Sequence, residues 1–347
     1  MSEPGKIRVL VIDDSAIVRK VLTDALSHEA DIEVVGTAPD PFVARDKILS
    51  LNPDVLTLDI EMPRMDGVSF LKRLMHYHPL PVIVISSLGL ASSRTALEAL
   101  EAGAIDVLAK PGGPQSVGEL RLSLASKIRT ARIARLQRTN NASERQSPLV
   151  PRSFRQFPSS AVIAIGASTG GTEAIHKVLA GFPENCPGVV IVQHIPAIFS
   201  RSFANRLNDL CTIRVREAEE GDKLEPGLAL VAPGNFHMLL RRNLCGYRVE
   251  IKDGPLVCFQ RPAVDVLFHS VAETAGPNAT AAILTGMGSD GVQGMLAMKK
   301  VGARTIAQDE TSCAVFGMPR EAIRSGAVDR ILPLPAIADA LLTESRR

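Results

Sequence analysis

The sequence is poor in the features that would assign it to several specialised classes of protein. Only 4% of its 347 residues are aromatic and its formal net charge is +2, so the charge gives no support for a nucleic-acid-binding or membrane-surface protein. No apolar run approaches the roughly 18–20 residues of a membrane span, and the N-terminus lacks the apolar h-region of a signal peptide. We therefore expect a cytoplasmic protein that neither inserts into a membrane nor binds nucleic acid.

Paired cysteines are missing as well. The chain has no Cys-x-x-Cys pair and no Cys/His cluster with the spacing of a zinc site. Its cysteines are odd in number, and we interpret them as reduced thiols of a cytosolic protein: Cys186, Cys211, Cys245, Cys258 and Cys313. Val, Ile, Leu and Ala dominate the 46% of hydrophobic residues, and the length favours two domains.

The first 110 residues alternate short apolar runs with stretches of helical spacing. The runs predict five strands: Ile7–Ile12, Ile32–Val35, Val55–Leu58, Val82–Ile85 and Asp106–Ala109. This alternation predicts a five-stranded parallel sheet with helices on both of its faces. Ligands of such sheets bind at the carboxyl ends of the strands.

A linker and a second α/β domain follow. Residues 118–138 have a helical and basic pattern, which we interpret as a solvated face, and residues 139–158 are polar with turn-forming residues. Further apolar strands are predicted at Val189–Val192, Leu228–Val231 and Ala281–Leu284, which indicates a doubly wound, mainly parallel sheet. We assign residues 5–125 to the first domain, 126–158 to the linker and 159–345 to the second domain.

Polar residues follow the predicted strands of the first domain. Asp13 and Asp14 end the first strand, Asp59 the third and Ser86 the fourth, and Lys110 follows the fifth. All five side chains should meet at one edge of the sheet. Three carboxylates there would repel one another without a cation, and hard oxygen ligands suit Mg²⁺. The lysine and the hydroxyl suit a phosphoryl group held against Asp59.

These residues lie in runs that closely resemble the receiver domain of bacterial two-component response regulators. The resemblance covers about residues 5–125 and implies a flavodoxin-like fold. The matching runs are Val-Ile-Asp-Asp-Ser at 11–15, Leu-Asp-Ile-Glu-Met-Pro-Arg-Met-Asp-Gly at 58–67, Ser86-Ser87 and Lys110-Pro111.

The resemblance assigns a role to each residue of the acidic edge. Asp59 is the expected phosphoacceptor, Ser86 and Lys110 are expected to sense the phosphoryl group, and the bond before Pro111 is expected to be cis. The implied Mg²⁺ ligands are Asp14, Asp59 and the backbone carbonyl of Glu61, with Asp13 assisting. Phosphorylation adds a charge of about −1.5 to −2, enough to rearrange a loop or an interface.

A serine lies at the apex of a glycine turn in the second domain. The apolar run Ala161–Ile165 predicts a strand, Gly166-Ala-Ser168-Thr-Gly170 has the Gly-x-Ser-x-Gly spacing of a nucleophile elbow, and a helical stretch begins at Thr172. Glycines permit backbone angles that a Cβ atom would forbid. A phosphate-binding turn or a purely structural turn would give a similar pattern.

A nucleophilic serine requires a base, and the second domain contains four histidines. His176 is expected on the helix after the turn and pointing away from it, His237 follows a Pro-Gly-Asn turn, and His269 is expected to be partly buried. His194 directly follows a predicted strand, so it should lie beside Ser168 if the two strands are neighbours. We therefore choose His194 as the base.

The orienting carboxylate is predicted in a second glycine-rich turn. Ala281–Leu284 leads into Thr285-Gly-Met-Gly-Ser-Asp-Gly291, where Asp290 is the candidate and free N–H groups could form an oxyanion hole. A helix N-cap is the alternative role for this aspartate, and the two roles are compatible. The order Ser168, His194, Asp290 differs from the Ser, Asp, His order of typical α/β-hydrolases.

The second domain closely resembles the catalytic domain of the chemotaxis protein-glutamate methylesterases (CheB). The resemblance covers about residues 160–342. Its runs are Ile-Gly-Ala-Ser-Thr-Gly-Gly at 165–171, Gln-His-Ile-Pro at 193–196, Arg-Pro-Ala-Val-Asp-Val-Leu-Phe at 261–268, Leu-Thr-Gly-Met-Gly-Ser-Asp-Gly at 284–291 and Phe-Gly-Met-Pro-Arg at 316–320.

This resemblance implies an enzyme that hydrolyses glutamate γ-methyl esters, and deamidates particular glutamines, on the cytoplasmic helices of chemoreceptors. It implies the Met287 amide as oxyanion donor, with Thr169 lining the pocket, and no cofactor for ester hydrolysis. The receiver is expected to cover the site until a chemotaxis histidine kinase phosphorylates Asp59. We expect a monomer, because no dimerising helix stands out.

Two other classes of protein fit less well. A nucleotide-binding module would need Gly-x-Gly-x-x-Gly, with glycine where Ser168 stands. A transcription regulator would need a basic recognition helix, which the second half of the chain does not have in concentrated form.

Overall fold

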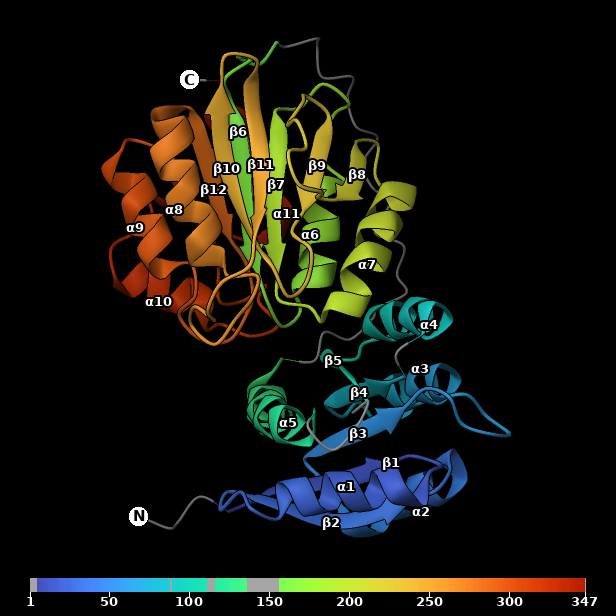
Figure 1. The fold of residues 1–347 in the computed structure, drawn as a ribbon. Helices are drawn as coiled ribbons and strands as arrows, with labels where there is room; N and C mark the ends of the chain where they lie inside the picture. Colours follow the sequence, from blue (N-terminus) through green and yellow to red (C-terminus); the bar gives the residue numbers. More distant parts are fainter. Residues whose placement is uncertain (1–4, 88, 111–115, 136–155, 347) are drawn as a thin grey trace. The chain divides into compact units, whose positions relative to one another are not determined.

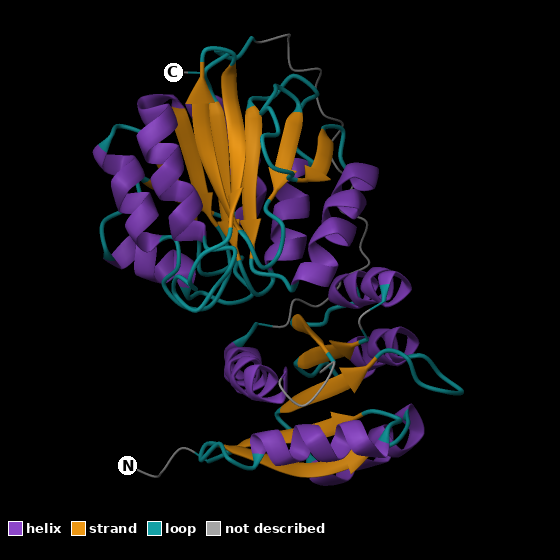
Figure 2. Ribbon diagram, in the orientation of Figure 1, coloured by secondary structure: helices purple, strands orange, loops and turns teal. Residues whose placement is uncertain are grey.

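The computed structural model describes residues 5–87, 89–110, 116–135 and 156–346 (Figure 1). The chain divides into two compact units, Met1–Thr139 and Asn140–Arg347. Each unit contains one parallel sheet with its own helices (Figure 2). Within the described residues, no helix is both long enough and apolar enough to cross a membrane.

The first unit is a five-stranded, fully parallel sheet in the order β2-β1-β3-β4-β5. Its strands are β1 (Ile7–Ile12), β2 (Ile32–Ala38), β3 (Val55–Asp59), β4 (Val82–Ser86) and β5 (Asp106–Ala109). Its helices are α1 (Ala16–Leu26), α2 (Pro41–Leu51), α3 (Gly67–Tyr77), α4 (Leu90–Glu101) and α5 (Ser116–Ile133). Every residue of β3 and β4 is buried, as is typical of central strands covered on both faces. The predicted sheet is therefore confirmed.

Helix α5 crosses residue 125, where the sequence suggested the end of the first domain. Its basic side chains form ion pairs within this unit. Lys127 Nζ lies 2.6 Å from Asp106 Oδ2, Arg129 Nη2 lies 2.6 Å from Asp31 Oδ1, and Arg132 Nη1 lies 2.5 Å from Asp54 Oδ2. These charges attach α5 to its own domain.

The second unit contains a seven-stranded sheet in the order β14-β13-β12-β6-β7-β9-β8, and all of its pairs are parallel. Its strands are β6 (Val162–Ala167), β7 (Gly188–Gln193), β8 (Arg214–Glu217), β9 (Leu228–Val231), β12 (Ala279–Ile283), β13 (Arg304–Gln308) and β14 (Arg330–Leu332). An antiparallel hairpin of β10 (His237–Asn243) and β11 (Gly246–Lys252) accompanies the sheet. The hairpin was not predicted, but the parallel α/β class is confirmed.

Helices cover both faces of this sheet (Figures 1 and 2). One layer consists of α8 (Val264–Ala275), α9 (Val292–Lys300) and α10 (Met318–Arg324), which share an apolar core with the hairpin. The other layer consists of α6 (Gly171–Leu179), α7 (Ala197–Leu210) and α11 (Leu334–Glu344). Alternate residues of β6 face the two layers, because successive side chains of a strand point to opposite sides.

Candidate functional site

The sheet of the second unit changes direction around β6. The chain proceeds from β6 to β7 on one side and later returns to β12 on the other side. Ligands of open α/β sheets bind in the crevice beyond the carboxyl ends at such a switch point. Ser168 follows β6, His194 follows β7, and the glycine-rich loop 285–291 follows β12.

The turn that carries Ser168 depends on two glycines for different reasons. Gly170 has a φ of 75°, in the left-handed region that favours glycine, whereas Gly166 is needed for space. A Cβ atom on Gly166 would lie 2.3 Å from Val264 Cγ1 of α8. The Gly171 amide donates to the Ser168 carbonyl at 2.7 Å and closes the turn at the start of α6.

The loop after β12 lies directly against this serine. The Ser168 amide donates to the Thr285 carbonyl at 3.0 Å, and a Cβ atom on Gly286 would lie 2.6 Å from Ser168 Cβ. Thr285 Oγ1 lies 3.0 Å from the Thr169 carbonyl and accepts from the Val315 amide at 2.9 Å. These contacts hold the loop at close range to the serine.

Met287 follows Gly286 in this loop. Its amide has no hydrogen-bond partner among the described residues, and its side chain is 41% exposed. An unpartnered N–H beside a candidate nucleophile is what an oxyanion hole requires.

His194 is adjacent to Ser168 because β6 and β7 pair in register. Ala167 pairs with Gln193, and the His194 amide donates to the Ala167 carbonyl at 3.1 Å. The buried Gln193 amide group donates to the Ser168 carbonyl at 2.8 Å and to the His194 carbonyl at 3.2 Å. Gln193 thereby bridges the two candidate residues.

Asp290 completes the group. Its Oδ2 lies 2.8 Å from His194 Nε2, and both side chains are buried. The carboxylate also accepts from the amides of Val264 at 2.7 Å and Asp265 at 2.9 Å, at the N-terminus of α8. A helix N-terminus and charge-assisted hydrogen bonds both stabilise a negative charge. Asp290 therefore binds both the histidine and a helix N-terminus.

The hydrogen bond to Asp290 assigns the tautomer of His194. A carboxylate can only accept, so Nε2 carries the proton and Nδ1 keeps its lone pair. His194 Nδ1 is buried and has no hydrogen-bond partner among the described residues, so Ser168 Oγ is not bonded to it. The structure thus brings Ser168, His194 and Asp290 together at the carboxyl edge of the sheet and leaves the serine–histidine contact open.

A second buried carboxyl group lies beside Asp290. Asp265 accepts from the Gly294 amide of α9 at 2.7 Å, and the Cys258 thiol lies 3.8 Å from its Oδ2. Burial, with a smaller contribution from the negative charge of Asp290, raises the pKa of Asp265. Asp265, Gln193 and Thr285 were not predicted as site residues, although each lies next to or within one of the runs that predicted the site.

The other histidines lie outside this contact network. His176 is on α6, 3.9 Å from Glu173 Oε2, and His237 is buried with Nε2 2.9 Å from the Pro255 carbonyl. His269 is exposed, so the prediction of partial burial was wrong. It occupies the outer face of α8 between two buried residues, Phe268 and Ser270.

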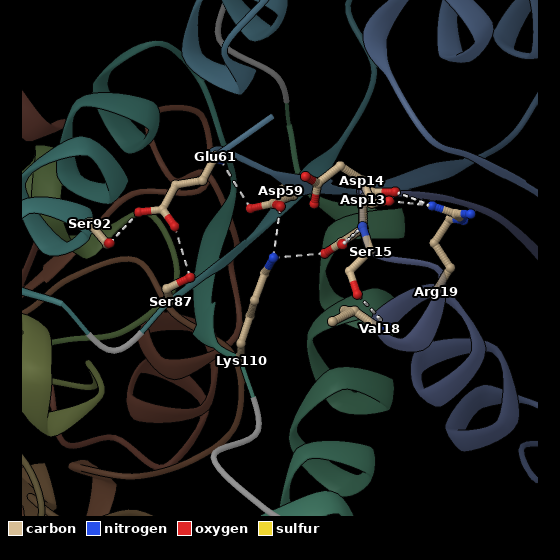
Figure 3. A network of polar contacts seen from close by, with 10 residues as sticks. All are labelled: Asp13, Asp14, Ser15, Val18, Arg19, Asp59, Glu61, Ser87, Ser92 and Lys110. Atoms are coloured by element: carbon tan, nitrogen blue, oxygen red, sulfur yellow. Dashed lines mark hydrogen bonds and ion pairs between the residues drawn. The ribbon is translucent and has the colours of Figure 1, made fainter. Parts of the chain in front are cut away.

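The acidic residues of the first unit meet at the carboxyl edge of its sheet (Figure 3). Lys110 Nζ lies 2.7 Å from Asp59 Oδ2 and 3.0 Å from Asp13 Oδ2. Oxygens of Asp13, Asp14 and Asp59 all lie within 4.8 Å of one another. Asp13 and Asp59 are buried and Asp14 is exposed, so the group is open to solvent on one side.

This arrangement fits a divalent cation. Burial raises the pKa of both Asp13 and Asp59, and hydrogen bonds from Lys110 offset part of that effect. Three carboxylates face one lysine, which leaves negative charge for a cation to compensate. The oxygen donors are those that Mg²⁺ prefers.

A second network links this edge to the start of α4 (Figure 3). The Glu61 amide donates to Asp59 Oδ1 at 3.1 Å, and its carboxylate accepts from Ser87 at 2.9 Å and from Ser92. These two hydroxyls lower the pKa of Glu61. Ser86 Oγ donates to the Ser92 carbonyl at 3.4 Å. Pro111, whose peptide bond was expected to be cis, lies outside the described residues.

Comparisons with known proteins agree with this architecture. Residues 163–341 match the family described as CheB methylesterase, and residues 9–120 match the response regulator receiver domain. The "Protein-glutamate methylesterase/protein-glutamine glutaminase 2" of Syntrophus aciditrophicus (strain SB) is 57% identical over 97% of this chain and 99% of its own length. A Salmonella typhimurium (strain LT2) protein named "Protein-glutamate methylesterase/protein-glutamine glutaminase" is 52% identical over 98% of this chain and 97% of its own length.

Among solved structures, the catalytic domain of Thermotoga maritima CheB methylesterase superposes with a TM-score of 0.52 at 36% identity. The superposition covers 54% of this chain and 99% of the Thermotoga maritima domain. A receiver sheet and a serine-centred α/β domain in one chain define a response regulator with a hydrolase as its second domain. The chain belongs to the CheB methylesterase family.

Proposed function

We propose that this protein hydrolyses glutamate γ-methyl esters, and deamidates glutamines, on the cytoplasmic helices of chemoreceptors. The observation that carries the proposal is the buried His194–Asp290 pair beside Ser168, with His194 Nδ1 lacking a partner among the described residues. The names of the relatives supply the substrate class.

Acylation begins when His194 Nδ1 takes the proton of Ser168. The serine oxygen attacks the ester carbonyl, and His194 passes the proton to the departing methanol. General-base catalysis of this kind contributes roughly 10²–10⁴ in rate. The open contact between Ser168 and His194 tightens when substrate binds, as catalytic hydrogen bonds of unliganded enzymes commonly do.

Deacylation uses the same residues in reverse. His194 Nδ1 activates a water, which attacks the acyl-serine and releases the free glutamate. Asp290 holds the Nε2 proton throughout and stabilises the imidazolium that forms twice in the cycle. Hydrogen bonds from the Val264 and Asp265 amides stabilise the negative charge of Asp290.

The Met287 amide is the proposed oxyanion donor. It belongs to the loop that Gly286 brings against Ser168, and it lacks a partner among the described residues. A donor of this kind contributes about 10²–10³ in kcat. Thr169 is proposed to line the same pocket.

Phosphorylation of Asp59 by a chemotaxis histidine kinase is the proposed control. Mg²⁺, held by Asp13, Asp14, Asp59 and the Glu61 carbonyl, would neutralise charge on the incoming phosphoryl group. Lys110, already within 2.7 Å of Asp59, would bind a phosphoryl oxygen, and Ser86 would turn from Ser92 to another. The added charge then shifts the protein from a less active to a more active state.

We also propose that the receiver extends from residue 5 to Arg132, the linker from there to residue 158 and the esterase over 159–345, in a monomeric cytoplasmic protein. The α5 ion pairs support moving the end of the receiver from residue 125 to Arg132.

Methanol release from a methylated receptor fragment tests the catalytic proposal. Ser168→Ala should lose release by a factor of at least about 10³, because the nucleophile is removed. Ser160→Ala, in the turn that precedes the same strand, is the matched control and should behave as wild type. Release that persists in Ser168→Ala would exclude this serine as the nucleophile.

A further inference from the structure

A two-residue turn with an unusual backbone lies beside the catalytic group. Val257 and Gln260 exchange two backbone hydrogen bonds, of 3.1 and 2.9 Å. The residues between them, Cys258 and Phe259, have φ values of 50° and 62°. Tight turns of this kind normally carry Asn and Gly, because other side chains are disfavoured in the left-handed region. A bulky phenylalanine there is an outlier.

The two side chains of the turn point to different environments. The Cys258 thiol lies 3.8 Å from Asp265 Oδ2, and the Asp265 amide donates to the catalytic candidate Asp290 at 2.9 Å. Phe259 is 91% exposed. The turn therefore connects to the carboxylate side of the proposed triad and presents its aromatic ring to solvent.

The loop around this turn is firmly held. Arg261 contacts Asp253 Oδ1 at 2.5 Å and Asn235 Oδ1 at 2.8 Å. His237, which is buried, lies 2.9 Å from the Pro255 carbonyl. These contacts hold the backbone of the loop that carries the exposed ring, so binding a partner would order little further backbone.

Other apolar side chains are exposed on the same structural unit. Leu256 lies in the same loop, and Phe236 follows Asn235 on the loop to which Arg261 is bonded. Because aromatic residues in pre-organised positions dominate binding energy at protein interfaces, this surface suits a polypeptide partner. Strained backbone likewise concentrates at ligand clamps.

We propose that Phe259 is a substrate-docking residue, which contacts an apolar side chain of the protein that carries the esterified glutamate. The proposal rests on the proposed function and adds a specificity determinant outside the acyl pocket. The ester group itself is small, so the ring serves recognition of the polypeptide and takes no part in bond making.

Phe259→Ala tests the proposal by comparing two substrates, a methylated receptor fragment and 4-nitrophenyl acetate. We expect kcat/KM for the receptor fragment to fall about tenfold through a higher KM, the size of a typical interface hot spot. Ser168-dependent hydrolysis of the small ester should change less than about twofold. If wild type does not hydrolyse the small ester, the receptor fragment alone tests the proposal. A higher KM at constant kcat in Phe259→Ala then supports docking, and a lower kcat at constant KM contradicts it.

Two further variants separate docking from folding. Phe259→Gly also removes the ring, but glycine adopts a positive φ without strain. This variant should therefore bind the receptor fragment as poorly as Phe259→Ala does, while the protein keeps its wild-type stability. Leu244→Ala is the matched control, since Leu244 is fully exposed at the far end of the β10–β11 hairpin. It should leave both substrates unaffected.

Three results would overturn the proposal. An unchanged KM for the receptor fragment in Phe259→Ala would remove the docking role. An equal loss on both substrates would assign the turn to the integrity of the site. Raised activity without phosphodonor, at an unchanged KM, would assign the ring to regulation. Failure of the proposed function itself would be recognised separately, as wild-type protein that releases no methanol.

Discussion

Both sheets of this protein carry polar residues at the carboxyl ends of their strands, yet the two edges differ in their balance of positive and negative charge. In the receiver, Lys110 already bridges Asp13 and Asp59, and negative charge still exceeds positive charge. In the esterase, the charge of Asp290 is matched by two α8 amides and His194. The first edge therefore fits a divalent cation. At the second edge, His194 Nδ1 has no hydrogen-bond partner among the described residues, which is what a general base requires.

Removing the charge of Asp290 is the strongest test of this difference. Asp290→Asn should lower kcat for ester hydrolysis by about 10³–10⁴, because an amide favours the wrong tautomer of His194. Methanol release measures the effect. Asp209→Asn, an exposed aspartate on α7, is the control. A loss smaller than about tenfold would mean that Asp290 serves only to bind the N-terminus of α8.

A methyl group at Gly286 should have the next largest effect. Its Cβ atom would lie 2.6 Å from Ser168 Cβ and 2.5 Å from Met318 Sδ, so the loop must move away from the serine. A displacement of about 1 Å in a catalytic site can cost about 10² in rate. Gly286→Ala with unaltered kcat would contradict the placement of Met287 as the oxyanion donor.

At the receiver edge, a smaller effect is expected from Ser92→Ala. Ser92 donates to the Glu61 carboxylate, and its carbonyl accepts from Ser86, so it holds the β4–α4 connection in the observed arrangement. Losing one such hydrogen bond, worth about 0.5–1.5 kcal/mol, should lower the half-saturating phosphodonor concentration by about two- to tenfold.

Stimulation of esterase activity against phosphodonor concentration gives that value. Ser50→Ala, which removes a surface hydroxyl of α2, should match wild type. A half-saturating concentration that rises in Ser92→Ala would contradict a restraining role for this serine.

The smallest effect concerns the pH dependence of stability. The folded protein raises the pKa of Asp265 above its ordinary value of 3.8, so the folded state binds more protons there than the unfolded state. Stability from this group is therefore lost as pH rises from about 4 through the raised pKa.

Asp265→Asn should lack that loss. Its melting temperature relative to wild type should increase with pH, by about 2–4 °C for each kcal/mol involved. Scanning calorimetry of the full chain at pH 5 and pH 8 measures this. If the melting temperature of Asp265→Asn relative to wild type falls toward alkaline pH, burial does not raise the pKa of Asp265.

Local sequence was enough to predict the strands of the first unit, the strands β6, β7, β9 and β12 of the second, and the residues that follow them. Ser168, His194 and Asp290 each come after an apolar run, and parallel strands bring their carboxyl ends to one edge. The same logic gave Asp13, Asp14, Asp59, Ser86 and Lys110. His269 was misjudged because an apolar stretch does not reveal which side of a helix each residue occupies.

Contacts between distant segments were not predictable in this way. The bonds from the α8 amides to Asp290, and from Cys258 to Asp265, depend on how a loop and a helix pack against the sheet. No local pattern marks Phe259 either, because a phenylalanine is not expected in the left-handed region where the structure places it.

Control of the serine site by the receiver is tested by methanol release from wild type and Asp59→Asn, each with and without a small phosphodonor and Mg²⁺. The phosphodonor should stimulate wild type and leave Asp59→Asn unchanged, and Ser168→Ala should abolish all release. Equal stimulation of Asp59→Asn, or no stimulation of wild type, would contradict control of the serine site by the acidic edge of the receiver.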